Sequence, residues 1–89
     1  MEPLFQIGQT VIINLQENVN YPFGINSYML SLSGKSARII GVIPDYYENN
    51  SYHSVLGDRC KYLIDIDKNG YSWSSPMFRN FNLRKLSIY

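Results

Sequence analysis

This 89-residue sequence contains a single cysteine, Cys60, which excludes a disulfide within the chain and a zinc site built from several cysteines. Charged residues make up only 17% of it, and its formal net charge is +1. Proteins that coat nucleic acid by bulk electrostatic attraction need a larger positive balance. No apolar run approaches the roughly 18 residues of a membrane span, and residues 1–5 lack the basic and apolar regions of a signal peptide. We therefore expect a cytoplasmic protein that does not contact membranes.

The sequence does have enough apolar residues for one core. They make up 45% of the chain, which has neither an internal repeat nor a low-complexity segment. This composition is typical of one globular domain, here residues 1–89. Alternation of apolar and polar residues predicts short strands over 9–15, 36–43, 61–67, 71–74 and 82–86.

Capping signals predict two short helical segments. Asn26 or Ser27 is suited to be the N-cap of a helix of one or two turns, and Gly34 stands where a C-cap is expected. Near the end of the chain, Ser75 as cap and Pro76 at the first helical position favour a single helical turn. Neither segment is long enough to change a mainly β architecture.

The strand predicted over 61–67 sets the expected orientation of its side chains. Asp65 and Asp67 should face solvent, while the core should receive Tyr62, Ile64 and Ile66. Asn69-Gly70 after it is a hairpin signal. The preceding stretch, 44–59, shows no helical periodicity and is predicted to be a long loop, a kind of segment that often carries function.

Five short strands, one long early loop and a helical turn before the last strand favour a small five-stranded SH3-like barrel with a short helix or helical turn. A five-stranded OB-fold is the nearest alternative, although OB-folds usually need a longer chain. Four short motifs follow one another along the chain. They are Phe5-x-Ile7-Gly8-x-x-Val11-x-Ile13, Gly34-Lys35-x-Ala37-x-Ile39, Tyr62-x-Ile64-Asp65-Ile66-Asp67 and Tyr71-x-Trp73-Ser74-x-x-Met77.

With these motifs the chain resembles small SH3-like proteins encoded by phages and mobile elements of low-GC bacteria. The resemblance covers about residues 5–78. It departs from the family pattern at 44–59, which is longer than usual, and at Gln9, where an acidic residue is common. The resemblance implies an SH3-like fold, a location in the cytoplasm of a bacterial host cell and a host protein as partner. It supplies no catalytic residue.

Aromatic residues are the strongest functional signal, because there are more of them than one small core can bury. Those in 16–33 and 44–59 should be partly exposed, where rigid amphipathic rings favour binding. In SH3-like folds these two loops lie near each other, an analogy at the level of the fold. For Trp73, a place in the core or in the wall of a groove is favoured over direct contact with a ligand. The candidate partner-binding residues are Tyr21, Phe23, Tyr28, Tyr46, Tyr47, Tyr52 and Trp73.

We therefore expect a non-enzymatic protein-binding module of phage or mobile-element origin. One form of this hypothesis is a module that blocks a host factor, such as a defence enzyme. Nucleic-acid binding is an alternative, because residues 68–89 carry four basic and no acidic side chains, whereas residues 1–67 carry four basic and seven acidic ones. The basic candidates are Lys61, Arg79, Arg84 and Lys85. A small-molecule or nucleotide binder formed at an oligomer interface is a third possibility.

Catalytic and cofactor motifs are incomplete in this sequence. Nothing places His53 beside Cys60 as the base that a nucleophilic thiol needs. The calcium-loop echo that starts at Asp65 has Pro76 where the last ligand, a glutamate, is required. Residues 34–36 match only the end of a phosphate-binding loop. We expect neither catalysis nor a cofactor.

Overall fold

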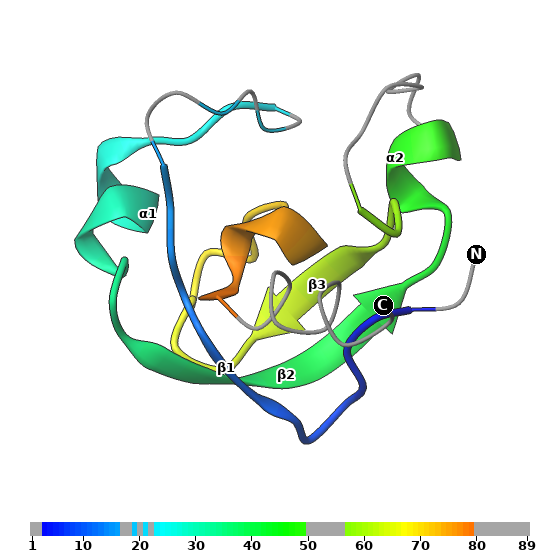
Figure 1. The fold of residues 1–89 in the computed structure, drawn as a ribbon, viewed down its shortest axis with the longest axis horizontal. Coiled ribbons are helices and arrows are strands. Elements are labelled where there is room, and N and C mark those ends of the chain that lie inside the picture. The colour runs from blue at the N-terminus through cyan, green and yellow to red at the C-terminus, as the bar shows by residue number, and fades with distance from the viewer. Residues whose placement is uncertain (1–2, 17–18, 20, 22, 50–56, 80–89) are drawn as a thin grey trace, which may run out of the picture.

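The computed structural model describes residues 3–16, 19, 21, 23–49 and 57–79 (Figure 1). It is a small, mainly β structure with a three-stranded antiparallel sheet of order β1-β2-β3 and little helix. The elements along the chain are β1 (Thr10–Ile12), α1 (Ser27–Ser31), β2 (Ser36–Ile43), α2 (Tyr46–Asn49), β3 (Lys61–Ile64) and the 3₁₀ turn η1 (Ser75–Met77). No helix of these residues is both long and apolar enough to cross a membrane.

The sheet matches the predicted strands to different degrees. β2 has the predicted bounds, because Pro44 ends a run of β-branched residues. β1 is shorter than the predicted 9–15. The strand predicted over 61–67 ends at Ile64, and the one predicted over 71–74 contributes only an isolated bridge. The strand predicted over 82–86 lies outside the described residues.

The chain after β3 returns to both edges of the sheet. Tyr62 in β3 forms an isolated antiparallel bridge with Trp73, and Ile13 after β1 forms one with Phe78. The backbone N–H of Asn14 also donates to the carbonyl of Met77 over 2.7 Å. The sheet therefore curves around η1, which is orange in Figure 1.

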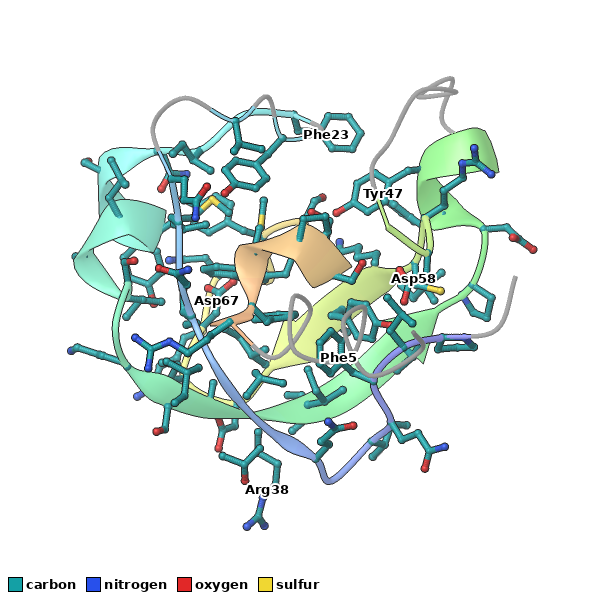
Figure 2. The ribbon with its side chains drawn as sticks, in the orientation of Figure 1. Phe5, Phe23, Arg38, Tyr47, Asp58 and Asp67 are labelled. Carbon is teal, nitrogen blue, oxygen red and sulfur yellow. The ribbon has the colours of Figure 1, made fainter. Side chains whose placement is uncertain are left out.

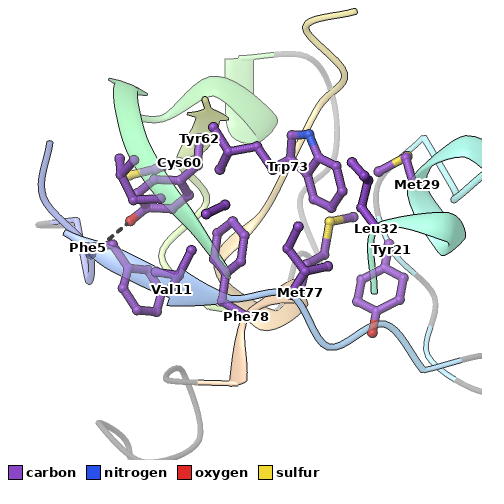
Figure 3. Packing of buried hydrophobic residues seen from close by; sticks show 14 residues of the cluster. Phe5, Val11, Tyr21, Met29, Leu32, Cys60, Tyr62, Trp73, Met77 and Phe78 are labelled. Atoms are coloured by element: carbon purple, nitrogen blue, oxygen red, sulfur yellow. Dashed lines mark hydrogen bonds between the residues drawn. The ribbon is translucent and has the colours of Figure 1, made fainter. Parts of the chain in front are cut away.

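The core lies inside this curve. Phe5, Tyr62 and Phe78 form a triangle of edge-to-face rings, with centroids 5.5–5.9 Å apart (Figure 3). Each such pair adds roughly 0.5–1.5 kcal/mol to the burial of its rings. Trp73 stacks on Phe78 at 6.3 Å and is fully buried, which confirms its placement in the core. The buried apolar cluster also includes Val11, Ile13, Met29, Leu32, Ile39, Cys60, Ile64 and Met77.

Both short helical segments are present, with shifted ends. Asn26 is the N-cap of α1, where its side-chain oxygen accepts the Met29 N–H over 2.8 Å, as expected. The C-cap is Leu32, and Gly34 lies two residues beyond it with φ 91°, leading into β2. η1 is the expected helical turn, but its N-cap is Ser74, and Ser75, the predicted cap, is instead the first residue of the turn.

Two expectations about side chains and loops are wrong. Asp67 is 8% exposed and does not face solvent, because alternation stops where β3 ends and three N–H donors turn the carboxylate inward. The stretch 44–59 is not all loop, since α2 begins at Tyr46. Asp45 before it has φ 56°, a left-handed conformation that aspartate tolerates better than most residues and that turns the chain from β2 into α2.

Candidate functional site

Three aromatic rings from a loop and a distant short helix meet on one side of the molecule. Phe23 comes from the connection between β1 and α1, and Tyr46 and Tyr47 form the first turn of α2. The Phe23 ring centroid lies 6.4 Å from that of Tyr46 and 6.0 Å from that of Tyr47. Figure 2 shows Phe23 and Tyr47 approaching each other from facing segments. We call Phe23, Tyr46 and Tyr47 the aromatic edge. It confirms that the stretches 16–33 and 44–59 come close to each other at these residues, although the second is helical there.

Phe23 is held in an unfavourable backbone conformation. Its φ is +61° and that of Gly24 is +71°, and the Gly24 N–H closes the turn by donating to the Tyr21 carbonyl over 2.9 Å. A bulky residue in the left-handed region is a genuine outlier, at a cost of about 1–2 kcal/mol. The ring is nevertheless 53% exposed, so burial of this side chain offsets only part of the cost of the left-handed backbone conformation. Strained backbone positions cluster at active sites and ligand-binding sites, which makes Phe23 a candidate contact residue.

The two tyrosines of the aromatic edge differ in exposure. Tyr47 is fully buried and its hydroxyl donates to the Trp73 carbonyl over 2.9 Å. Its ring therefore forms the buried base on which the Phe23 and Tyr46 rings pack. Tyr46 is half-buried, and the Lys61 ammonium lies 5.0 Å from its ring centroid. A cation over an aromatic face at this distance is attracted to it. Phe23 and Tyr46 are therefore the rings that a partner can reach.

The other aromatic candidates do not join the aromatic edge as contact residues. Tyr21 is buried, contrary to the exposure expected of loop tyrosines, because its hydroxyl accepts the Gln16 N–H over 3.0 Å and its ring joins the core. Trp73 is core rather than surface. Tyr28 is half-buried and packs on Tyr71, with ring centroids 5.7 Å apart. Tyr52 lies outside the described residues.

The basic candidates for nucleic-acid binding are only partly described. Lys61 lies beside Tyr46, as stated above, and Arg79 is exposed. Arg84 and Lys85 lie outside the described residues. Of the two basic candidates that are described, the structure places Lys61 at the aromatic edge.

The sequence patterns did not identify Asp67 as the residue that holds the turn after β3. Its Oδ1 accepts the Asn69 N–H over 2.8 Å, and its Oδ2 accepts the Tyr71 N–H over 2.9 Å and the Trp73 indole N–H over 2.7 Å. One carboxylate thus fixes the turn after β3 and the position of Tyr71. An aspartate two residues before Asn-Gly is an Asx-turn signal, which could have indicated this role.

A second buried carboxylate, Asp58, organises the opposite end of the core. Its Oδ2 accepts the Leu4 N–H over 2.8 Å and a short hydrogen bond from the Tyr62 hydroxyl, and its Oδ1 accepts the Cys60 N–H over 3.1 Å. The Tyr62 hydroxyl in turn accepts the Phe5 N–H over 3.2 Å, the dashed line in Figure 3. Asp58 therefore joins the N-terminal segment to β3.

Burial governs the chemistry of the only cysteine. Cys60 is fully buried, and desolvation, reinforced by the nearby negative charge of Asp58, raises the pKa of its thiol to about 11. At neutral pH the side chain is therefore an uncharged thiol, which is a poor nucleophile and a poor metal ligand. Among the residues with described positions, no three His, Cys, Asp or Glu side chains are grouped to hold a metal ion.

The buried thiol should resist modification in the native protein. We expect Cys60 to react with an aromatic disulfide reagent at pH 8 at least about 100-fold more slowly in buffer than in denaturant, because a raised pKa and burial both limit attack. The measurement is the absorbance of the released thiolate with and without about 6 M guanidinium chloride, a concentration that unfolds most proteins completely. Equal rates in the two conditions would contradict the buried placement.

Comparison with protein-family models, curated proteins and solved structures finds no match to this chain. The resemblance to small SH3-like phage proteins stays a prediction. Support for a function therefore comes from the aromatic edge itself.

Proposed function

We propose that this protein is a non-enzymatic protein-binding module whose contact surface is the aromatic edge. The observation that carries the proposal is Phe23, an exposed ring on a left-handed backbone, which lies beside two tyrosines of α2. Exposed aromatic rings on a rigid support supply large contact area at low entropic cost, and they are enriched among residues that dominate binding energy.

For the fold we propose an SH3-like barrel whose last two strands are very short. Its support is the order of the pairings: β1, β2 and β3 pair in sequence, and single bridges at Trp73 and Phe78 follow on either side of η1. In SH3 domains an aromatic-lined groove between loops receives the ligand. The aromatic edge lies between the corresponding loops of this chain, which is an analogy of position.

The partner that we propose is a bacterial host protein, for example a factor of host defence. This part of the proposal rests on the resemblance of the sequence to small SH3-like phage proteins and not on the geometry. The geometry adds that the reachable part of the edge is apolar at Phe23 and cationic beside Tyr46, where Lys61 lies.

Removing the Phe23 ring should weaken partner binding. After capture of the partner from nuclease-treated bacterial lysate, we expect Phe23→Ala to raise its Kd at least about tenfold, since exposed aromatic anchors contribute 1.4 kcal/mol or more. The measurement is isothermal titration calorimetry with the purified partner. Ile40→Ala is the matched control, because Ile40 is equally exposed, at 54%, but lies on β2.

A glycine variant separates contact from folding. Phe23→Gly also removes the ring, yet glycine adopts positive φ without strain, so this variant should bind as weakly as Phe23→Ala while keeping a better-formed turn. Wild-type affinity in both variants, or an equal loss in Ile40→Ala, would reject the aromatic edge as the contact surface.

Nucleic-acid binding is the second candidate, favoured by the Lys61 ammonium over the Tyr46 ring, since single-stranded ligands combine stacking with phosphate contacts. It makes a different prediction, because phosphate contacts release counterions. A complex that disappears with nuclease and weakens steeply with salt would favour this candidate over the protein-binding module.

A further inference from the structure

A pocket of about 290 Å³ opens on the side of Phe23 that faces α1. One wall is the turn of Phe23 and Gly24, the other is the turn of Gly70 and Tyr71, and Met29 of α1 contributes to the lining. We propose that this pocket binds one uncharged apolar side chain, of the size of leucine or phenylalanine, from the partner polypeptide. The inference rests on the proposed function and deepens it, because it names the residue class that the partner inserts.

The size of the pocket selects a single side chain. An apolar cavity of about 150 Å³ holds a benzene-sized molecule, so 290 Å³ accommodates one large side chain with part of its backbone. Sites for cofactors and drug-sized ligands occupy about 300–1,000 Å³ and enclose most of the ligand. The pocket is at the lower limit of that range, which suits a small ligand such as one side chain.

The chemistry of the lining selects an apolar side chain. None of the described residues around the pocket carries a charge; Phe23, Ile25, Met29 and Tyr71 supply apolar groups, and Asn26 and Ser72 supply polar ones. A lysine or glutamate inserted here would lose hydration without gaining a charged partner. Met29 is 3% exposed, and its flexible thioether can adjust to rings or branched chains.

Both walls are already fixed in the free protein, which limits the entropy lost on binding. The first wall is closed by the hydrogen bond from the Gly24 N–H to the Tyr21 carbonyl, and Asn26 caps α1 directly after it. The second wall is held by Asp67, which accepts the Tyr71 N–H. The Tyr28 ring then joins α1 to the second wall through Tyr71.

The glycines at the rim keep the entrance open. A Cβ added at Gly24 or Gly70 would meet no atom of the described residues within 4 Å, so the backbone has room at both positions. Both have positive φ, +71° and +69°, which other residues adopt only with strain. An incoming main chain can therefore approach the rim closely.

The test uses two blocked amino acids that differ only in their side chains. N-acetyl-leucinamide is titrated into ¹⁵N-labelled full-length protein, and we expect saturable shifts at Gly24, Ile25, Gly70 and Tyr71 with a Kd on the order of 1–10 mM, typical of about a dozen ligand atoms. N-acetyl-lysinamide is the control, for which we expect at least about tenfold weaker shifts.

Two variants localise the effect. Ser72→Leu places an apolar side chain in the pocket from within, because Ser72 lines it, and should abolish the leucinamide shifts. Ser36→Leu, at an exposed position in β2, should leave them unchanged. The wild-type titration stands independently of whether Ser72→Leu folds.

The possible outcomes separate this inference from the proposed function. Shifts that do not saturate, shifts of equal size with lysinamide, or shifts outside the pocket overturn the pocket assignment, even where Phe23→Ala still weakens the partner. Selective leucinamide binding beside unchanged partner affinity in Phe23→Ala would show a side-chain site that this partner does not use, because Phe23 is a wall of the pocket. That result overturns both the insertion of a partner side chain and the aromatic edge as the contact surface.

Discussion

Replacing Asp58 with alanine is expected to lower the free energy of unfolding by about 4 kcal/mol, because two buried donors and one partly buried donor lose their acceptor and a buried unsatisfied donor costs about 1–3 kcal/mol. The donors are the N–H groups of Leu4 and Cys60 and the hydroxyl of Tyr62. A domain of this size has roughly 4–13 kcal/mol in total, so the variant should be near its limit of stability. Urea denaturation followed by the fluorescence of Trp73, the single tryptophan, measures the change.

Asp65→Ala is the matched control for this prediction. Asp65 is exposed and accepts one N–H, from Arg38 over 3.0 Å, so its loss should cost less than about 1 kcal/mol. Asp58→Asn should fall between the two, because an amide replaces one of two acceptor oxygens by a donor. Similar stabilities of Asp58→Ala and Asp65→Ala would contradict the role assigned to Asp58.

The sequence predicted those parts of the fold that local signals determine. Pro44 ends β2, Asn26 caps α1, and a serine and a proline mark η1, each acting within a few residues. Asp58 has no such signal, since its partner Leu4 lies 54 residues away. A contact of that range follows from how the sheet curves, which no local pattern contains.

Asp67 shows where a period-2 pattern misleads. Extending the alternation of β3 past Ile64 places Asp67 in solvent, but the chain turns there and the carboxylate becomes the acceptor for the turn and for Trp73. The partners of Asp67 lie only two to six residues further along the chain. The local Asx-turn signal before Asn69-Gly70 therefore indicates this arrangement, whereas the period-2 pattern does not.

The aromatic edge was predictable as a neighbourhood but not residue by residue. The abundance of aromatics indicated that some would be exposed, and the two loops do meet at Phe23, Tyr46 and Tyr47. Successive residues of a helix point in different directions, so Tyr46 reaches the surface while Tyr47 turns inward to the Trp73 carbonyl. The identity of the exposed tyrosine depended on α2, which the sequence did not indicate.

Alkaline pH should destabilise the protein steeply. Burial raises the pKa of Cys60 from 9.0 to about 11, and it raises the pKa values of Tyr47 and Tyr62 above their ordinary 10.0. The unfolded chain therefore releases protons above about pH 9 that the native state still holds, so the free energy of unfolding falls as pH rises. Each such proton contributes about 1.4 kcal/mol per pH unit, which gives roughly 2–3 kcal/mol per unit near pH 10.5.

Urea denaturation between about pH 8 and pH 10.5 measures this slope, and single substitutions assign it to residues. Tyr47→Phe should cost about 1 kcal/mol at neutral pH through the lost bond to the Trp73 carbonyl, yet flatten the slope above pH 10 by up to about 1.4 kcal/mol per unit. Cys60→Ala should flatten it from about pH 9, because the unfolded thiol titrates first. Stability that stays constant up to pH 10.5 would mean that these three groups reach solvent in the native state, and with Tyr47 exposed the support beneath Phe23 would be lost as well.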